Sequence, residues 1–239
     1  MTLDPVFLAP EMVPQFSPKT MLIRSLRDYH SKRERTQQIE VGPSSAGDCT
    51  RKVWHLYRQT PVTNESDILA SLLGTFIHTG IEAAITSEDP FGDDLLREFE
   101  VEHDGLKGHI DLYVFTWEAI NDWKTTQKKN LKNFPSQQNL YQIHIYGYLA
   151  IKNGKKVKMV ALTVIPRDGR LDEIVEYVAP YDESIALEGI AWLKNVEDWA
   201  NSDRRPPPPE RSAKNFCSNY CDFYDESALI GCPGIVGGR

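Results

Sequence analysis

The chain has 239 residues, of which 41% are hydrophobic and 26% charged, as is usual for a globular protein with a sizeable core. The 27 Lys and Arg against 34 Asp and Glu give a net charge of −7, so contact with nucleic acid would require local basic patches. No run of about 18 apolar residues exists, which excludes a membrane span, and the start lacks a signal-peptide pattern. We therefore expect a cytoplasmic protein without membrane partners.

Residues 1–40 are predicted to form a helical adaptor separate from the main domain. Four prolines interrupt the beginning, and a helix is expected over residues 19–40. Five basic residues fall within twelve positions of this helix, namely Arg24, Arg27, Lys32, Arg33 and Arg35. A solvated helix face explains any single one of them, whereas the group as a whole is compatible with a patch that faces phosphates.

Residues 41–205 are predicted to form one α/β domain with a mixed sheet. The clearest helix spans residues 66–86, with Ser66 as its cap. Its apolar face is expected to comprise Ile68, Leu69, Leu72, Leu73, Phe76, Ile77 and Ile81. Strands follow at residues 95–102, 106–115 and 119–124, and the short turn at 116–118 predicts an antiparallel hairpin between the last two.

The second half of this domain begins with a helix at residues 137–152. Strands at 156–165 and 172–178 follow, joined by a turn, and an amphipathic helix at 182–201 closes the domain. The packing face of that last helix is expected to comprise Ile185, Leu187, Ile190, Leu193, Val196 and Trp199. This order of helices and strands indicates the α/β class.

Residues 206–239 form a third segment. It starts with four consecutive prolines at 206–209, which are expected to form a stiff extended spacer. It holds Cys217, Cys221 and Cys232, whereas Cys49 precedes the strands. Four cysteines are too few for a disulfide scaffold, and in a reducing compartment grouped cysteines are more often metal ligands or buried thiols.

Two acids and a lysine on neighbouring strands form the strongest chemical signal. Asp111 lies in the strand at 106–115, and Asp122 and Lys124 lie two residues apart on the next strand, hence on one face. A hairpin can bring Asp111 beside Asp122, where the carboxylates repel each other unless a cation lies between them. Such ligands suit Mg²⁺ or Mn²⁺, and this ion with a nearby lysine is what phosphodiester hydrolysis requires. Asp111 by itself would be a surface charge, so the hypothesis depends on the combination.

The combination resembles the PD-(D/E)xK nuclease superfamily, specifically its RecB-like branch, over roughly residues 42–232. Four segments match the family's motifs in order: Gly74-Thr75-Phe76-Ile77-His78, Gly108-His109-Ile110-Asp111, Asp122-Trp123-Lys124-Thr125 and Gln142-Ile143-His144-Ile145-Tyr146. The resemblance implies a restriction-endonuclease-like fold, with a mixed central sheet flanked by helices and with the N- and C-terminal segments joined by a metal cluster.

The resemblance also implies roles for individual residues. The metal ligands would be His78, Asp111, Asp122 and the backbone carbonyl of Trp123. Lys124 would position the nucleophile, and Gln142 and Tyr146 would contact DNA or order the site. A nitrogen ligand in this set is expected to make the site tolerate or prefer Mn²⁺ over Mg²⁺.

Several neighbouring residues are left open by the pattern. Glu98 and Glu100, on the preceding strand, are alternative ligands or water-mediated supports, and the sequence does not choose between them. His109 and His144 are assigned no role and are expected to be structural or near the DNA.

The cysteines resemble those of RecB-like nucleases with a [4Fe–4S] cluster, including AddB-type, CRISPR-associated and phage exonucleases. The stretch from Ser44 to Arg51 matches the family's Ser-x-x-x-x-Cys-x-Arg entry motif. The resemblance implies that the cluster ligands are Cys49, Cys217, Cys221 and Cys232. An iron–sulfur cluster is the first choice, zinc the second and free thiols the third.

Basic and aromatic residues follow the expected catalytic lysine. Lys128, Lys129 and Lys132 can neutralise phosphates, and Phe134 and Tyr141 can stack unpaired bases. A solvated loop explains any one of these lysines equally well. Arg51, in the cysteine entry motif, is a further candidate for substrate binding. Nothing indicates that base edges are recognised.

The first hypothesis is a metal-dependent DNA exonuclease that acts on single strands or duplex ends with little sequence specificity. Recombination, repair or CRISPR adaptation in a bacterium or a phage-infected host would be its setting, and candidate partners are a recombinase, a helicase or a single-strand-binding protein. The alternatives are a non-catalytic DNA-binding subunit of a recombination or helicase complex, and a zinc-stabilised endonuclease of the same superfamily. The intact set of Asp111, Asp122 and Lys124 favours catalysis.

Overall fold

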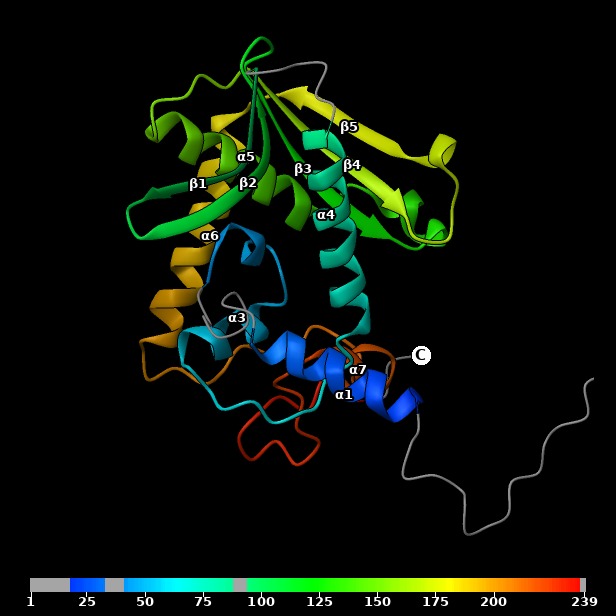
Figure 1. Cartoon of the computed structure of the whole chain (residues 1–239). Coiled ribbons are helices and arrows are strands. Elements are labelled where there is room, and N and C mark those ends of the chain that lie inside the picture. The colour runs from blue at the N-terminus through cyan, green and yellow to red at the C-terminus, as the bar shows by residue number, and fades with distance from the viewer. Residues whose placement is uncertain (1–17, 33–40, 88–93, 237–239) are drawn as a thin grey trace, which may run out of the picture. The chain divides into compact units, whose positions relative to one another are not determined.

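The computed structural model describes residues 18–32, 41–87 and 94–236 (Figure 1). The chain divides into two compact units, Met1–Ile39 and Glu40–Arg239. The described part of the first unit is helix α1 (Pro18–Ser31), none of whose residues is buried, followed by Lys32. The predicted continuation of this helix to residue 40, with Arg33 and Arg35, lies outside the described residues.

The second unit is built on a five-stranded mixed sheet with the strand order β1-β2-β3-β4-β5. The strands are β1 (Leu95–His103), β2 (Leu106–Val114), β3 (Ala119–Thr126), β4 (Met159–Pro166) and β5 (Val175–Pro180). Neighbours are antiparallel except β3 and β4, which are parallel and therefore need a long crossover between them. The α/β class, the mixed sheet and the β2–β3 hairpin are confirmed.

Helix α5 (Gln137–Lys152) is that crossover, and it forms where the sequence predicts it. Ser136 begins it with a capping box, in which Ser136 Oγ accepts from Asn139 N (3.2 Å) and Asn139 Oδ1 accepts from Ser136 N (3.1 Å). α5 packs against β1, β2, β3 and β4 and also against α6 (Glu183–Ala200) (Figure 1). This packing encloses most of the hydrophobic core.

Helix α4 begins later than the sequence predicts, at Leu69, and extends to Ser87. Asp67 rather than Ser66 binds the first turn, since Asp67 Oδ1 accepts from Leu69 N (2.9 Å). The Ser66 hydroxyl is instead hydrogen-bonded to the Asp222 carboxylate in the C-terminal segment. The predicted cap is therefore wrong.

The predicted packing face of α4 is also wrong in part. Leu72 is buried, but Leu69, Leu73 and Phe76 are 51%, 40% and 44% exposed. The sheet contact of this helix is with β3, so one strand covers less of its circumference than the apolar pattern implies.

Helix α6 packs through small residues that the predicted face omits. Its buried residues are Ala186, Gly189, Leu193, Val196 and Ala200. Leu187 is 48% exposed, so its assignment to the packing face is wrong. A Cβ atom at Gly189 would lie 2.9 Å from Ile145 Cδ1 on α5, which shows how closely the two helices approach.

Short elements complete the unit: η2 (Pro43–Ser45), α3 (Thr50–Tyr57), η4 (Lys128–Asn133), η5 (Leu171–Glu173), η6 (Ala213–Cys217) and α7 (Ser218–Tyr220). Because η5 occupies the predicted start of the last strand, β5 begins at Val175. The proline stretch at 206–209 has no helix or strand, and the buried Pro207 accepts a hydrogen bond from Arg51 Nη1 (3.1 Å). No helix within the described ranges is long and apolar enough to cross a bilayer.

Truncation at two positions of α6 tests which of its faces is packed. Leu193→Ala should lower the free energy of unfolding by about 2–5 kcal/mol, because it empties a buried position. Leu187→Ala should change it by about 0.5 kcal/mol or less, because this side chain is half exposed. Urea denaturation measures both values, and equal losses would contradict the orientation of α6.

Candidate functional site

Asp111 and Asp122 lie side by side where the β2–β3 ladder ends. The last paired residues are Leu112 and Asn121, so the two acids occupy the next position in the register. There the Asp111 side chain takes the place of a backbone acceptor, and its Oδ2 accepts from Trp123 N (2.7 Å). Asp111 is 9% exposed and Asp122 3%. The hairpin therefore holds two carboxylates together with little access to water.

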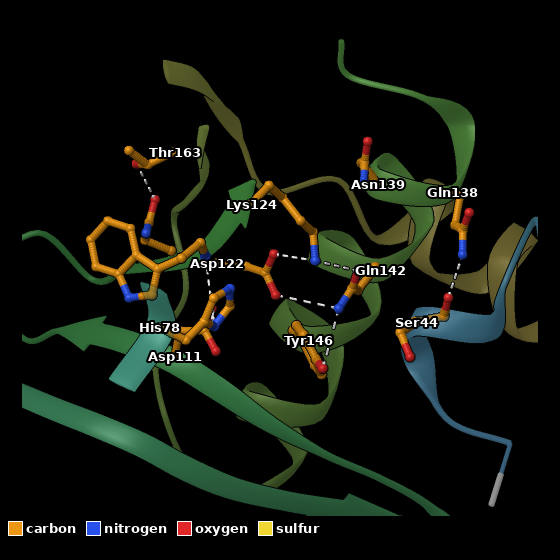
Figure 2. Close-up of polar contacts among 12 residues, drawn as sticks. Ser44, His78, Asp111, Asp122, Lys124, Gln138, Asn139, Gln142, Tyr146 and Thr163 are labelled. Atoms are coloured by element: carbon orange, nitrogen blue, oxygen red, sulfur yellow. Dashed lines mark hydrogen bonds and ion pairs between the residues drawn. The ribbon is translucent and has the colours of Figure 1, made fainter. Parts of the chain in front are cut away.

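Three polar side chains join Asp122 in a network from β3 to α5 (Figure 2). Lys124 Nζ lies 2.5 Å from Asp122 Oδ2 and donates to Gln142 Oε1 (2.8 Å). Gln142 Nε2 donates to Asp122 Oδ1 (3.3 Å) and to Tyr146 OH (3.4 Å). Gln142 and Tyr146 are one turn apart and both buried, so this face of α5 closes the site. Gln142 thus orders the acid and the lysine.

Gly108 on β2 makes room for the Tyr146 ring. A Cβ atom at this position would lie 2.5 Å from Tyr146 Cε1 and 3.3 Å from Pro43 Cγ. The glycine that opens the Gly108–Asp111 motif is therefore required by packing, three residues before the acid.

His78 reaches the same place from α4. Its Nδ1 lies 3.6 Å from Asp111 Oδ2, and its ring is hydrogen-bonded to the Trp123 backbone. Burial lowers the pKa of His78, although the charge of Asp122 opposes this effect. A neutral imidazole keeps a nitrogen lone pair for a metal ion. Figure 2 shows His78 beside Asp111 and close to Asp122.

The electrostatics of this group favour a bound cation. Burial and then the charge of Asp122 raise the pKa of Asp111 to about 7. Two buried carboxylates that lie side by side oppose each other's ionisation unless positive charge is near. Lys124 supplies one charge, yet Asp122 Oδ2 has no hydrogen bond of good geometry besides this ion pair.

The donor set fits a hard divalent ion after a small rearrangement. In the part of the chain that the structure describes, no three His, Cys, Asp or Glu side chains are grouped closely enough to hold a metal as they stand. Asp111 and Asp122 direct oxygens at Trp123 N and Lys124 Nζ, respectively. Rotation of these carboxylates away from those partners would free oxygen ligands beside His78.

Glu98 rather than Glu100 is the further acid near this centre. The pairing of β1 with β2 is interrupted at Glu98, which lies opposite Asp111 in the register and has a φ of 45°. The charge of Glu98 raises the pKa of both Asp111 and His78. Glu100 pairs instead with His109 in the ladder.

The predicted DNA-contacting lysines lie on η4, immediately after β3, and are exposed. Lys128 is bound to a neighbouring turn, since its backbone N donates to Asp168 Oδ1 (2.7 Å) and its Nζ pairs with Glu173. Among the described residues, neither Lys129 nor Lys132 forms a hydrogen bond or an ion pair with the carboxylate network. Arg51 lies in α3 and donates to Pro207 O, so the structure places it with the C-terminal segment and apart from Asp122.

The expected stacking residues contribute to packing. Phe134 and Tyr141 are partly buried against the hydrophobic core. His144 is buried in α5, where its Nδ1 accepts from Asp182 N (3.1 Å) at the start of α6. The surroundings of these three side chains are therefore those of packed, structural residues.

The four cysteines, distant in sequence, line one cavity. Cys49 directly precedes α3, Cys217 ends η6, Cys221 follows α7, and Cys232 lies in the loop beyond. The cavity is small, with about 10 Å³ available to the centre of a water molecule, and it is partly open to solvent. All four are free thiols, and the three C-terminal ones are buried.

Hydrogen bonds hold the C-terminal segment against the residues around α3. Asn64 Nδ2 donates to Cys221 O (3.0 Å), and Thr63 N donates to Asp222 O (2.9 Å). Thr50 N, in the first turn of α3, donates to Glu210 Oε2 (2.9 Å). These contacts bring Cys49 and the late cysteines together without any covalent link.

The thiols share an environment that disfavours negative charge. Burial raises the pKa of Cys217 to about 11, and the other three cysteines, as potential thiolates, raise it as well. Four thiolates would need a cationic centre to offset their repulsion, and thiolate sulfur is a soft ligand for iron or zinc. Their thiolate chemistry suits a metal or iron–sulfur centre, but within the described residues the thiols are not grouped closely enough to bind one, so binding would require them to close around it.

His55 also lines this cavity, and the sequence analysis missed it. Burial and, to a smaller extent, the charge of Arg51 lower its pKa to about 4, so the ring is neutral at neutral pH. One sequence signal could have indicated it. His55 lies three residues after Lys52 on α3, so the two side chains share one side of the helix, and both line the cavity.

A model of a known protein family matches most of this chain. The model of the PD-(D/E)XK nuclease superfamily matches residues 33–225. The chain belongs to this superfamily. No curated protein matches the sequence.

Several solved structures are similar to this chain at low sequence identity. SSO0001 has a TM-score of 0.53 and 18% identity over 92% of this chain and 98% of that chain, which supports the fold. An alkaline exonuclease from Laribacter hongkongensis has a TM-score of 0.46 and 13% identity over 73% of this chain and 94% of its own. A phage-related exonuclease from Haemophilus somnus 129PT has a TM-score of 0.38 and 11% identity over 53% of this chain and 68% of its own.

Removal of one buried charge tests the electrostatic account. In metal-free protein, Asp111→Asn should raise the melting temperature, because it ends the repulsion by Asp122 while an oxygen remains for Trp123 N. A gain of about 1 kcal/mol corresponds to roughly 2–4 °C for a chain of this size. The variant should also lose any stabilisation that Mn²⁺ confers on the parent.

Differential scanning calorimetry in EDTA and in Mn²⁺ measures both effects. Asp203→Asn, at an exposed position, is the matched control and should leave both melting temperatures unchanged. A metal-free Asp111→Asn variant that melts below the parent would contradict the account.

Proposed function

We propose that this protein is a divalent-metal-dependent DNA exonuclease. The observation that supports it best is the convergence of His78, Asp111 and Asp122 with the Lys124–Gln142 pair in one nearly buried site. Membership of the PD-(D/E)XK nuclease superfamily favours phosphodiester hydrolysis and DNA as the substrate.

The metal would be held by the Asp111 and Asp122 carboxylates, His78 and the backbone carbonyl of Trp123. A bound Mg²⁺ or Mn²⁺ supplies Lewis-acid polarisation of the phosphate and lowers the pKa of a ligated water. His78 favours tolerance of Mn²⁺, since imidazole is a softer donor than carboxylate.

Lys124 is proposed to orient the attacking water and to offset charge that develops on the phosphate. Gln142 serves as its positioning residue, because its amide contacts Lys124 through one atom and Asp122 through the other. Tyr146 in turn fixes the Gln142 amide. This arrangement keeps the lysine amine within reach of a phosphate bound at the acids.

The proposed substrate is a DNA end, either single-stranded or duplex, bound through its phosphates. The exposed lysines of η4 follow directly after the strand that carries Lys124, so Lys129 and Lys132 can meet a backbone that enters the site. This contact is independent of base sequence, and little sequence specificity is expected. A recombinase, helicase or single-strand-binding protein would be a suitable partner in DNA processing.

Variants of two residues test the catalytic proposal. Asp122→Ala and Lys124→Ala should each reduce metal-dependent DNA degradation by about a hundred-fold or more, because each removes a charge that acts on the transition state. Lys194→Ala, an exposed lysine on α6, is the matched control and should degrade DNA at the parental rate. Addition of EDTA should abolish the activity.

End-labelled single-stranded, linear duplex and closed circular DNA are the substrates for this assay. Circular DNA should stay intact, since an exonuclease requires an end. The catalytic assignment would be wrong if both Ala variants matched the parent, and cleavage of circles would indicate an endonuclease instead.

We further propose that the four cysteines hold a [4Fe–4S] cluster. In support, Cys49, Cys217, Cys221 and Cys232 line one cavity, and burial raises the pKa of Cys217, which makes a thiolate there unfavourable without a metal centre. Such a centre would tie the segment before α3 to the C-terminal segment, which restricts the unfolded chain strongly because the linked residues are far apart in sequence. Zinc is the second choice for the same ligands.

Metal analysis and one substitution test the cluster. Protein purified without oxygen should be brown and contain iron and sulfide, and Cys221→Ala should lose the colour and melt at a lower temperature. Ser218→Ala, on α7 beside it, is the control and should keep both properties. Unchanged iron and melting temperature in Cys221→Ala would exclude this ligand, and zinc without iron would favour the second choice.

A further inference from the structure

His55 is a buried, rigidly held ring that faces the cysteine cavity. It lies in α3 and is 1% exposed. Its ring stacks on Phe223 with a centroid distance of 5.2 Å and an interplanar angle of 17°, and it meets Trp54 edge-on at 5.0 Å. Phe223 lines the same cavity. The ring is therefore held in place by its aromatic neighbours at the lining of the cysteine cavity.

One ring nitrogen of His55 is bonded and the other is not. Nδ1 lies 3.0 Å from Thr60 Oγ1, a hydrogen bond between the end of α3 and the residue that follows its turn. Nε2 is buried and has no partner among the described protein atoms. A buried polar group without a partner is unfavourable, so an acceptor in the cavity would stabilise it.

The charged groups around the cavity do not provide that acceptor. Lys52 and Arg211 are both donors, and both are paired with Asp48. Glu210 lines the cavity and accepts from Thr50 N through its Oε2, and neither of its oxygens is bonded to His55 Nε2. Among the described lining residues, the four sulfur atoms and whatever they bind are the further acceptors.

We propose that His55 donates its Nε2–H to a sulfur atom of the cysteine-bound cluster and thereby tunes the cluster's reduction potential. The inference rests on the proposed cluster and concerns a role separate from ligation. The proposal assigns the Thr60 hydroxyl as donor to Nδ1, which leaves the proton on Nε2. Hydrogen bonds to cluster sulfur stabilise the more negative, reduced state, so they raise the potential.

Three variants separate the hydrogen bond from the packing of the ring. His55→Phe keeps the stack on Phe223 but removes the donor, and should shift the reduction potential to a more negative value. His55→Gln retains an amide donor near the position of Nε2 and should restore part of that shift. Thr60→Val frees the tautomer without touching the cavity and should shift the potential less than His55→Phe. His109→Phe, at an exposed position on β2, is the matched control.

Anaerobic redox titration, iron and sulfide analysis and resonance Raman spectroscopy are the readouts on the folded proteins. We expect full iron content in all variants and displaced Fe–S stretching bands in His55→Phe. Resonance Raman spectroscopy records these bands without reduction of the cluster. An unchanged potential and unchanged bands in both His55→Phe and Thr60→Val would overturn the inference. Iron lost from folded His55→Phe would also overturn it, because His55 would then be a ligand. Parental protein without iron would overturn the cluster itself together with this inference, whereas DNA degradation would remain a separate test of the nuclease site.

Discussion

The repulsion between two buried carboxylates is the constraint on which the site depends. Asp111 and Asp122 are held together by the β2–β3 hairpin just beyond its last ladder pair, and neither can move into water without disrupting the strands. Lys124 offsets part of the negative charge, and Gln142 fixes that lysine against the acid. The residual charge, with an imidazole beside it, is the physical reason for expecting a divalent ion. The fold thus stores an unfavourable interaction that a metal would relieve.

A second constraint closes the other end of the unit. The segment that begins with Cys49 and the segment that carries Cys217, Cys221 and Cys232 meet around one cavity, supported by hydrogen bonds from Thr63 and Asn64. One segment precedes the sheet in the sequence and the other follows it, so a link between them would connect the two ends of the nuclease core. A metal centre at this junction would stabilise the fold without any role in hydrolysis, which is why the two sites can be tested independently.

The sequence predicts the elements that depend on local pattern and fails where packing decides. The predicted strands at 95–102, 106–115 and 119–124 and the predicted helix at 137–152 agree with β1, β2, β3 and α5, and the two acids are brought together by the predicted hairpin. The packing faces of α4 and α6 are partly wrong, because exposure of Leu73 and Leu187 depends on which neighbours are present and on the close approach at Gly189.

Side-chain roles that arise from contacts could not be derived from spacing. The sequence left Glu98 and Glu100 equivalent, and only the interruption of the β1–β2 pairing opposite Asp111 separates them. Likewise, the Gln142 amide bridges Lys124 and Asp122 because α5 crosses over β3 at that point, which no pattern along the chain encodes. The proposed role of His55 likewise depends on its contacts around the cysteine cavity.

The most direct test of the central claim is the location of Mn²⁺ in crystals of the protein, from its anomalous scattering. The account predicts a peak coordinated by His78, the two carboxylates and the Trp123 carbonyl, with the Asp111 and Asp122 side chains rotated toward it. A crystal saturated with Mn²⁺ that shows no peak among these four groups, while the hairpin is intact, would contradict it.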